Sequence, residues 1–412
     1  MEIFAASYML PINGSPVAGG AIAVADGIIA AVGRLADLRK TYPADIREFP
    51  DCILMPGLVN AHTHLELTHF PAWLHKSGLG YAPRSYVDWI IQVIKVKRGI
   101  TFEDLCRSLH EGCKISLQSG TTMIGDILSD RRLLPVYADC GVAGRVYLEF
   151  IGHDPEKFQP LLETLDADIS KLPAGLLPGL SPHAPFTVSQ ELLAAVVAAA
   201  QRLEIPLTTH LAESEEEVRF LAGAPGKITG MLYPFVGWEK YAGSHHPSTP
   251  AEWLHCSGAL TGPLSAVHAV HLSLQEIRLL KEHHASIVLA PRSNSTLDVG
   301  RAPAWLMKQA DITMALGTDS LASSDSLSVF DEMRFLLDTY PDVFSPEDAV
   351  RMGTINGAHA IARGAEAGSL EVGKRADFIA VKTAGAPQGD RIYEQLLEDG
   401  SIHGVWCAGV GI

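Results

Sequence analysis

The sequence is poor in several features that mark particular classes of protein. Lysine and arginine number 32 against 47 acidic residues, which gives a net charge of −15, and they form no basic run. We therefore expect no nucleic-acid or anionic-membrane partner, because such surfaces are bound by clustered positive charge. No apolar run reaches the ~18 residues of a membrane helix. The first residues also lack the basic and apolar regions of a signal peptide.

Cysteine pairs and glycine-rich phosphate loops are also missing. The six cysteines are scattered along the chain and form no Cys-x-x-Cys motif. This pattern is typical of reduced thiols and predicts a cytoplasmic protein. No Gly-x-Gly-x-x-Gly follows an expected strand, which disfavours a dinucleotide-binding open sheet.

The order of apolar segments predicts the fold class. The 412 residues, of which 47% are apolar, suffice for one large and one smaller domain. Eight strand-like runs alternate with helix signals, which predicts an α/β protein with a (β/α)8 TIM barrel, and a doubly wound open sheet is the alternative. The expected strands are residues 52–60, 121–127, 144–151, 175–180, 205–209, 266–270, 286–290 and 312–317.

The two ends of the chain break this alternation. Residues 1–51 and 368–412 carry short strand-like pieces separated by turn signals, so we expect them to pair as one small β domain. We place this composite domain at residues 1–55 and 365–412, and the barrel at residues 56–364. The proline- and histidine-containing segment 244–252 is predicted to be a loop insertion after the fifth strand.

The most informative motif is His62-Thr63-His64, at the end of the first expected barrel strand. Residues two apart in a strand point to the same side, so both imidazoles face one way. Two neutral imidazoles held side by side are half of a transition-metal site. Such a pair alone is weak evidence, because packing and surface positions produce the same spacing.

Further titratable residues occur at the ends of other expected strands. His183 follows the fourth strand, His210 and Glu213 follow the fifth, His268 lies in the sixth, and Asp319 follows the eighth. In a barrel these positions meet at one rim, where active sites lie. Each residue alone could have a purely structural role. A coincidence of several such structural residues at one rim is a much weaker explanation than a shared site. Together they predict an active site.

These motifs together resemble the amidohydrolase superfamily, in its branch of nucleoside deaminases and chlorohydrolases. The resemblance spans nearly the whole chain, and it implies a barrel capped by a β-sandwich domain that both termini form. It rests on residues 56–64, on His210-Leu211-Ala212-Glu213, on His268, on Leu316-Gly317-Thr318-Asp319 and on the tail 368–377.

The resemblance implies one divalent metal ion, with zinc favoured and iron as the alternative. Its implied ligands are His62, His64, His210 and Asp319. Three neutral nitrogens and a carboxylate suit either ion and leave a position for water. The fourth strand has no lysine that could become a bridging carbamate, which disfavours the two-metal hydrolases of the superfamily.

The resemblance also implies catalytic roles for three side chains. Glu213 is expected to be the proton shuttle, His268 to orient the attacking water, and Asp319 to accept the proton of that water. A role for Glu213 as a first-turn helix acid is the alternative, and we expect Glu215, Glu216 and Glu217 to have that role. The implied reaction is attack of metal-activated water on an amino-bearing ring carbon, with release of ammonia.

Five residues are candidate substrate contacts. By resemblance we expect His183 to touch the substrate, whereas Asn294 could bind a nucleoside, Glu66 could bind ribose hydroxyls and Trp89 could face the pocket from a lid helix. Arg145, or Arg84 in its place, could pair with a substrate carboxylate. Core packing or a solvated loop is the alternative for several of these side chains.

Several stretches are most similar to the aminodeoxyfutalosine deaminases, namely residues 62–67, 88–90, 147–152 and 319–328. We therefore expect deamination at C6 of 6-amino-6-deoxyfutalosine, a small-molecule substrate of menaquinone biosynthesis. The alternatives are adenosine, methylthioadenosine or S-adenosylhomocysteine deamination, and guanine, triazine or amide hydrolysis. Ser320, Ser324 and Asp325 depart from the Thr-Asp-Gly-x-x-Ser-Asn-Asn of adenosine-type deaminases, which counts against those substrates.

An inactive scaffold is the alternative from another class of protein. Inactive members of such families lose metal ligands, whereas every expected ligand is present in this chain. The resemblance is compatible with a homodimer, which no sequence feature establishes.

Overall fold

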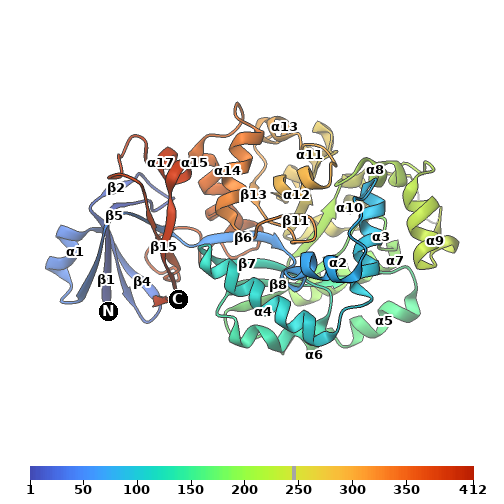
Figure 1. The fold of residues 1–412 in the computed structure, drawn as a ribbon, viewed down its shortest axis with the longest axis horizontal. Helices are drawn as coiled ribbons and strands as arrows, with labels where there is room; N and C mark the ends of the chain where they lie inside the picture. Colours follow the sequence, from blue (N-terminus) through green and yellow to red (C-terminus); the bar gives the residue numbers. More distant parts are fainter. Residues whose placement is uncertain (244–246) are drawn as a thin grey trace.

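The computed structural model describes residues 1–243 and 247–412, and they form two parts that lie side by side (Figure 1). The part at the left carries both termini, and the part at the right is a barrel of strands surrounded by helices. This arrangement confirms the predicted α/β class and the TIM barrel. The boundaries placed at residues 55 and 365 stay a prediction.

The barrel consists of eight parallel strands that lie in chain order. An isolated parallel bridge between Thr63 and Asp319 joins the first strand to the end of the last. The barrel is therefore nearly closed, and the carboxyl ends of all its strands meet at one rim. The strands are β6 (Leu58–Thr63), β7 (Thr121–Leu128), β8 (Ala143–Phe150), β9 (Leu176–Pro182), β10 (Leu207–Leu211), β11 (Leu264–His268), β12 (Ser286–Leu289) and β13 (Met314–Leu316).

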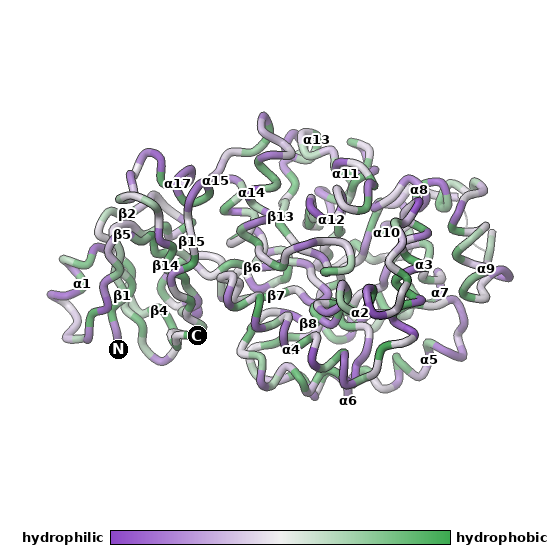
Figure 2. Tube along the Cα trace, viewed as in Figure 1, coloured by the Kyte–Doolittle hydropathy of each residue, from purple (hydrophilic) through white to green (hydrophobic). Residues whose placement is uncertain are grey.

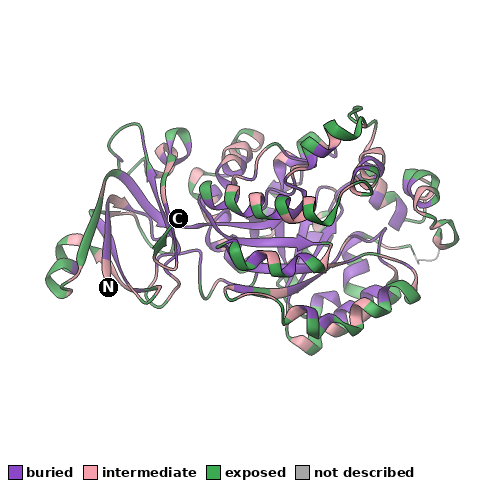
Figure 3. Cartoon of the chain, turned by 60° about the horizontal axis from the view of Figure 1, so that its bottom comes forward, coloured by how far each residue is buried: buried purple, intermediate pink, exposed green. Residues whose placement is uncertain are grey.

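Helices cover the outside of the barrel and expose one face each, while the strands between them are buried (Figure 3). A capping box of Ser273 and Glu276 begins α11. No helix in the described part of the chain is long and apolar enough to cross a membrane. The helices of the described chain, of which α1 packs on the part that carries both termini, are α1 (Leu35–Thr41), α2 (Phe70–Ser77), α3 (Tyr86–Lys97), α4 (Phe102–Gln118), α5 (Pro155–Glu163), α6 (Leu165–Ile169), α7 (Gln190–Leu203), α8 (Glu215–Leu221), α9 (Tyr233–Val236), α10 (Pro250–Cys256), α11 (Leu274–Glu282), α12 (Pro291–Thr296), α13 (Ala304–Gln309), α14 (Val329–Thr339), α15 (Pro346–Met352), α16 (Ile355–Ala360) and α17 (Ile392–Asp399).

A second sheet joins the two ends of the chain, as predicted. Its central strand β5 pairs in parallel with β1 and antiparallel with β14. Phe4, Phe378 and Trp406 pack against one another on this sheet, whose strands are largely hydrophobic (Figure 2). The strands are β1 (Glu2–Met9), β2 (Val17–Ala18), β3 (Gly20–Ala25), β4 (Ile28–Arg34), β5 (Asp45–Pro56), β14 (Phe378–Lys382), β15 (Ser401–Cys407) and β16 (Val410–Gly411).

The predicted first strand, residues 52–60, is wrong because the run contains two strands. Its first half ends β5, and its second half begins β6 in the barrel. Hydrogen-bond partners change at Gly57, whose N–H donates to Asp377 O, whereas the N–H of Leu58 donates to Gly120 O. Both halves are buried, so the apolar run continues through the change of sheet.

The predicted loop insertion at residues 244–252 is wrong at its end. Helix α10 begins within it, with Thr249 as N-cap, Pro250 in the first turn and Glu252 completing a capping box. Residues 244–246 lie outside the described residues.

Gly317 follows β13 where the chain passes closest to β6, and we expect it to tolerate no side chain. A Cβ there would lie 2.7 Å from both Cβ and O of His62. Gly317→Ala should therefore lower the free energy of unfolding by ~1–3 kcal/mol, as overpacking does. Urea unfolding measures this change. Gly230→Ala is the control, because no atom lies within 4 Å of a Cβ at that position; equal stability of the two variants would contradict the prediction.

Candidate active site

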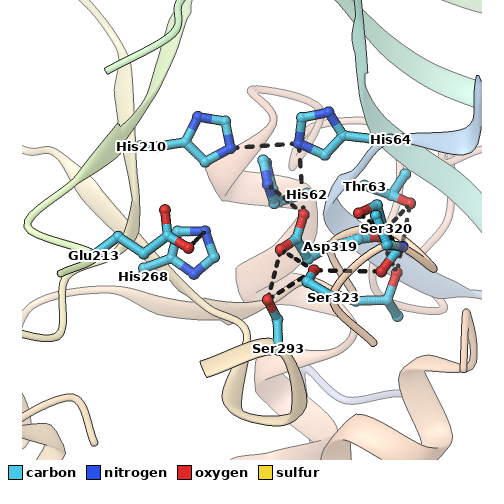
Figure 4. A network of polar contacts seen from close by, with 12 residues as sticks. His62, Thr63, His64, His210, Glu213, His268, Ser293, Asp319, Ser320 and Ser323 are labelled. Carbon is cyan, nitrogen blue, oxygen red and sulfur yellow. Dashed lines mark hydrogen bonds and ion pairs between the residues drawn. The ribbon is translucent and has the colours of Figure 1, made fainter. Parts of the chain in front are cut away.

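Six of the predicted residues meet at the carboxyl rim of the barrel (Figure 4). The strands that carry them are far apart in sequence, but all eight end at this rim. His62 and His64 come from the end of β6, His210 from β10, Glu213 from the turn after it, His268 from the end of β11, and Asp319 from the turn after β13.

Four of these side chains surround one point. His64 Nε2 lies 3.3 Å from His210 Nε2 and 3.5 Å from Asp319 Oδ1. His62 Nε2 lies 3.6 Å from the same carboxylate oxygen. One donor atom each of His62, His64 and Asp319 lie within 4.8 Å of one another, and the same holds for His62, His210 and His268. This spacing fits donor atoms that share one metal ion.

His62 gives independent support for a cation at this point. Its side chain is fully buried, and neither ring nitrogen has a hydrogen-bond partner among the described residues. An unsatisfied buried polar atom costs about 1–3 kcal/mol, so such atoms are rare without a ligand. The residues present therefore fit a divalent metal ion.

The electrostatics keep these donors in the form that binds metal. Burial lowers the pKa of His62 to about 4 and holds the pKa of His64 well below its ordinary value. Both imidazoles are thus neutral at pH 7, with a lone pair available. Burial alone would raise the pKa of Asp319, but the nearby imidazoles of His62, His64 and His268 hold that pKa well below its ordinary value.

Neighbouring groups fix the orientation of two of the donors. Ser293 and Ser323 donate hydrogen bonds of 2.6 and 2.7 Å to Asp319 Oδ2, while Oδ1 is the oxygen near His62 and His64. His210 Nδ1 lies 2.9 Å from the carbonyl oxygen of His183 and donates to it, which leaves Nε2 as an acceptor.

Glu213 lies beside the donor cluster without belonging to it. Its Oε1 is 3.7 Å from His268 Nε2, and Tyr86 OH donates a 2.6 Å hydrogen bond to Oε2. Burial raises the pKa of Glu213 to about 7. A carboxyl group with that pKa can both hold and release a proton near neutral pH.

The turn that carries Glu213 is held by Glu217, which sequence reasoning treated as an ordinary first-turn acid. Glu217 is buried, and its carboxylate accepts hydrogen bonds from the N–H groups of Ala212 (2.7 Å) and Glu213 (3.3 Å). Ala212 has a positive φ of 51°, so this turn is strained and needs such support. Tyr86, the other partner of Glu213, was also missed.

Tyr86→Phe should reduce turnover without loss of metal. The variant removes only the hydroxyl that donates to Glu213, and a hydrogen bond to a charged group contributes ~1.5–3 kcal/mol, or roughly 10- to 150-fold in kcat. Steady-state kinetics and metal analysis check this result. An unchanged kcat would show that the hydroxyl does not support Glu213 during turnover.

Two of the predicted substrate contacts lie away from the cavity beside the metal donors. Asn294 Oδ1 accepts a 2.9 Å hydrogen bond from His268 Nδ1, so it orients this ring and does not line the cavity. Arg145 lies near the start of β8 and donates to the carbonyl oxygens of Pro178 and Ile361. Only residues near the carboxyl end of a strand reach the rim, so Arg145 is at the wrong end of the barrel.

A cavity of about 200 Å³ opens beside the donor cluster. His183, Glu66 and Trp89 line it, so these three predicted substrate contacts do face the cavity. Trp89 donates from Nε1 to Ala322 O at 3.0 Å, which fixes its ring. The apolar part of the wall consists of Leu67, Trp89, Ile90, Val93, Ile94, Ile151, Leu232, Val236 and Trp238.

Comparison with known proteins identifies the family. The model of the amidohydrolase family matches residues 53–411, which is most of the chain. The chain belongs to the amidohydrolase family. A second model, the imidazolonepropionase-like composite domain of bacteria, matches residues 20–44 in the terminal sheet. This amidohydrolase is a hydrolase that acts on carbon–nitrogen bonds.

Individual relatives cover nearly all of this amidohydrolase. A 5-methylthioadenosine/S-adenosylhomocysteine deaminase of Halobacterium salinarum is 30% identical over 393 residues, which cover 89% of this chain and 83% of the relative. An aminodeoxyfutalosine deaminase of Deinococcus radiodurans is 27% identical over 362 residues, covering 85% and 82%. The crystal structure of an adenosine deaminase from Xanthomonas campestris with bound zinc has a TM-score of 0.83 at 26% identity, covering 100% of this chain and 92% of that one.

Proposed function

We propose that this amidohydrolase is a metal-dependent deaminase of an adenine nucleoside, with 6-amino-6-deoxyfutalosine as its substrate in menaquinone biosynthesis. The observation that carries the proposal is the position of Glu213. This proton-carrying carboxyl group faces His268 and shares one cavity with the metal donors His64, His210 and Asp319. Deamination of an amidine ring needs a metal-activated water and an acid for the ring nitrogen, and this site offers the residues for both.

The proposed metal is a single zinc ion held by His62, His64, His210 and Asp319, with iron as the alternative. The zinc in the adenosine deaminase from Xanthomonas campestris supports this choice. When bound, the ion would lower the pKa of a coordinated water from ~16 towards ~7 and so supply a nucleophile at neutral pH.

The chain's own residues would move the protons. Glu213 donates a proton to the ring nitrogen next to C6, while His268 holds the attacking water by a hydrogen bond. Asp319 accepts one proton of that water and passes it to the departing amino group, and the second proton of the water returns to Glu213 as the C6 carbonyl forms. A bond forms between the water oxygen and C6, the bond between C6 and nitrogen breaks, and ammonia and a 6-oxopurine leave.

The apolar wall of the cavity is an argument for a nucleoside substrate with an apolar 5′ substituent. Trp89, Val236 and Trp238 are among the apolar side chains beyond the metal donors, and they suit an aromatic ring. Since Arg145 lies elsewhere, the cation proposed for a substrate carboxylate is Arg84. It lines an outer cavity that shares Tyr86 and Trp89 with the inner one.

The alternative substrate is 5-methylthioadenosine or S-adenosylhomocysteine. The 30% identical relative from Halobacterium salinarum bears that name. The same apolar wall would also hold a methylthio group, so the wall alone does not separate the two substrates.

The test is a deaminase assay on the zinc-loaded protein. Aminodeoxyfutalosine, methylthioadenosine, S-adenosylhomocysteine and adenosine are supplied separately, with guanine and cytosine as controls, and the change from adenine to hypoxanthine absorbance near ~260 nm is followed. A true substrate should give kcat/KM of at least ~10⁴ M⁻¹s⁻¹. Preference for aminodeoxyfutalosine supports the proposal, and preference for methylthioadenosine supports the alternative. Lack of turnover of all four nucleosides by metal-loaded protein would overturn both.

A further inference from the structure

A polar cluster in the cavity wall has no part in the proton transfers described above. We call Glu66, Lys97, Ser129 and Glu149 the Lys97 cluster. They come from the ends of the first three barrel strands and from the end of α3, and all four line the cavity. Charged groups in a largely apolar wall cost desolvation energy, so their presence calls for a ligand or a structural reason.

Lys97 and Glu66 form the fixed part of the cluster. Lys97 Nζ donates to Glu66 Oε1 at 3.0 Å and to Ser129 Oγ at 2.9 Å. Glu66 is 1% exposed and also accepts hydrogen bonds from the N–H and the hydroxyl of Ser129. An ammonium has three N–H donors, so Lys97 keeps one for a ligand in the cavity.

Glu149 is the open part of the cluster. It lines the cavity, and no hydrogen bond to its carboxyl group occurs among the described residues. Burial raises its pKa to about 7, although the charge of nearby Lys97 acts in the opposite direction. Its two oxygens can therefore accept or share protons with a ligand.

The charge of the cluster excludes an anionic ligand group at this place. The positive charge of Lys97 is already paired with Glu66, and Glu149 adds a second carboxyl group. A phosphate or carboxylate would meet more negative than positive charge here. The free groups are one N–H donor and a carboxyl acceptor, and a neutral pair of adjacent hydroxyls complements both.

We propose that Glu149 and Lys97 bind the vicinal 2′,3′-diol of the substrate's ribose, with Glu66 and Ser129 holding Lys97 in place. The inference rests on the proposed function, because it names the sugar of the same nucleoside. The cluster and three of the metal donors line one cavity, and Glu66 follows His64 by two residues. A nucleoside whose base meets Glu213 can thus present its sugar to the Lys97 cluster, which selects ribosides over free bases and deoxynucleosides.

The test compares adenosine with 2′-deoxyadenosine, 3′-deoxyadenosine and 2′,3′-dideoxyadenosine on the zinc-loaded protein. Loss of a hydroxyl that a charged group binds should lower kcat/KM roughly 10- to 150-fold. Glu149→Gln and Lys97→Met should lose a similar factor on adenosine but change little on the dideoxy compound. Glu156→Gln, an exposed acid at the start of α5, is the matched control and should behave as the parent.

Direct binding separates failure of this inference from failure of the proposed function. Calorimetry with adenosine and dideoxyadenosine needs no turnover. Weaker binding of the dideoxy compound without deamination of any nucleoside would overturn the proposed function and keep the diol site. Deamination of both compounds at equal kcat/KM would overturn the diol site and keep the proposed function. Thermal unfolding shows whether Glu149→Gln and Lys97→Met are folded. If the folded variants still prefer adenosine to dideoxyadenosine as strongly as the parent does, the inference is overturned. It is also overturned if the parent binds neither compound.

Discussion

Glutamine in place of Glu213 should abolish nearly all turnover while the metal content stays the same. Glutamine has the size of glutamate but cannot carry a proton to the ring nitrogen. A positioned acid–base group contributes ~10²–10⁴-fold to the rate, so kcat should fall by about that factor. Glu213 is not one of the four expected metal donors, and its Oε1 lies 3.7 Å from His268 Nε2. The loss should therefore appear in kcat with little change in metal affinity.

The matched control for this variant is Glu215→Gln. Glu215 lies two residues further along and is exposed, so it should leave kcat and metal content unchanged. Steady-state kinetics and elemental analysis of both purified variants give the two quantities. Turnover of Glu213→Gln within tenfold of the parent would show that another group carries the proton.

The barrel could be predicted because its strands are buried on both faces. Such strands produce uninterrupted apolar runs, and eight of them alternate with capped helices. The change from β5 to β6 at Gly57 was not predicted although Pro56-Gly57 is a turn dipeptide, because buried apolar residues stand on both sides of it and read as one strand. The partners of these strands, residues far along the chain, decide where one sheet ends and the next begins.

The site was predictable where its residues follow strands, and less so elsewhere. His62, His210 and Asp319 converge because parallel strands end at one rim, a rule that needs no side-chain detail. Tyr86 and Lys97 reach the cavity from α3, whose position over the rim depends on tertiary packing that the sequence does not express. Arg145 lies near the start of β8, so its side chain is held at the opposite end of the barrel from the rim.

Removal of a single metal donor should abolish metal binding and turnover together. His64→Ala leaves three donors and opens a gap beside His210, and Asp319→Ala removes the only carboxylate of the four predicted ligands. Either variant should bind less than a tenth of the parent's zinc after gel filtration, and kcat should fall to background. His75→Ala, an exposed histidine of α2, should keep both properties.

Chelation distinguishes loss of metal from loss of fold. Ligand binding stabilises the native state by ~4 kcal/mol at a thousand times Kd, so a chelator should lower the unfolding midpoint of the parent clearly. It should leave the midpoint of His64→Ala nearly unchanged, because that variant has no metal to lose. Zinc added back should restore stability and turnover to the parent alone. If His64→Ala regained turnover with zinc, His64 would not be a required ligand. If the chelated parent kept full turnover, catalysis would not need the metal and the metal-dependent mechanism would be wrong. The unpartnered nitrogens of buried His62 would then need another explanation.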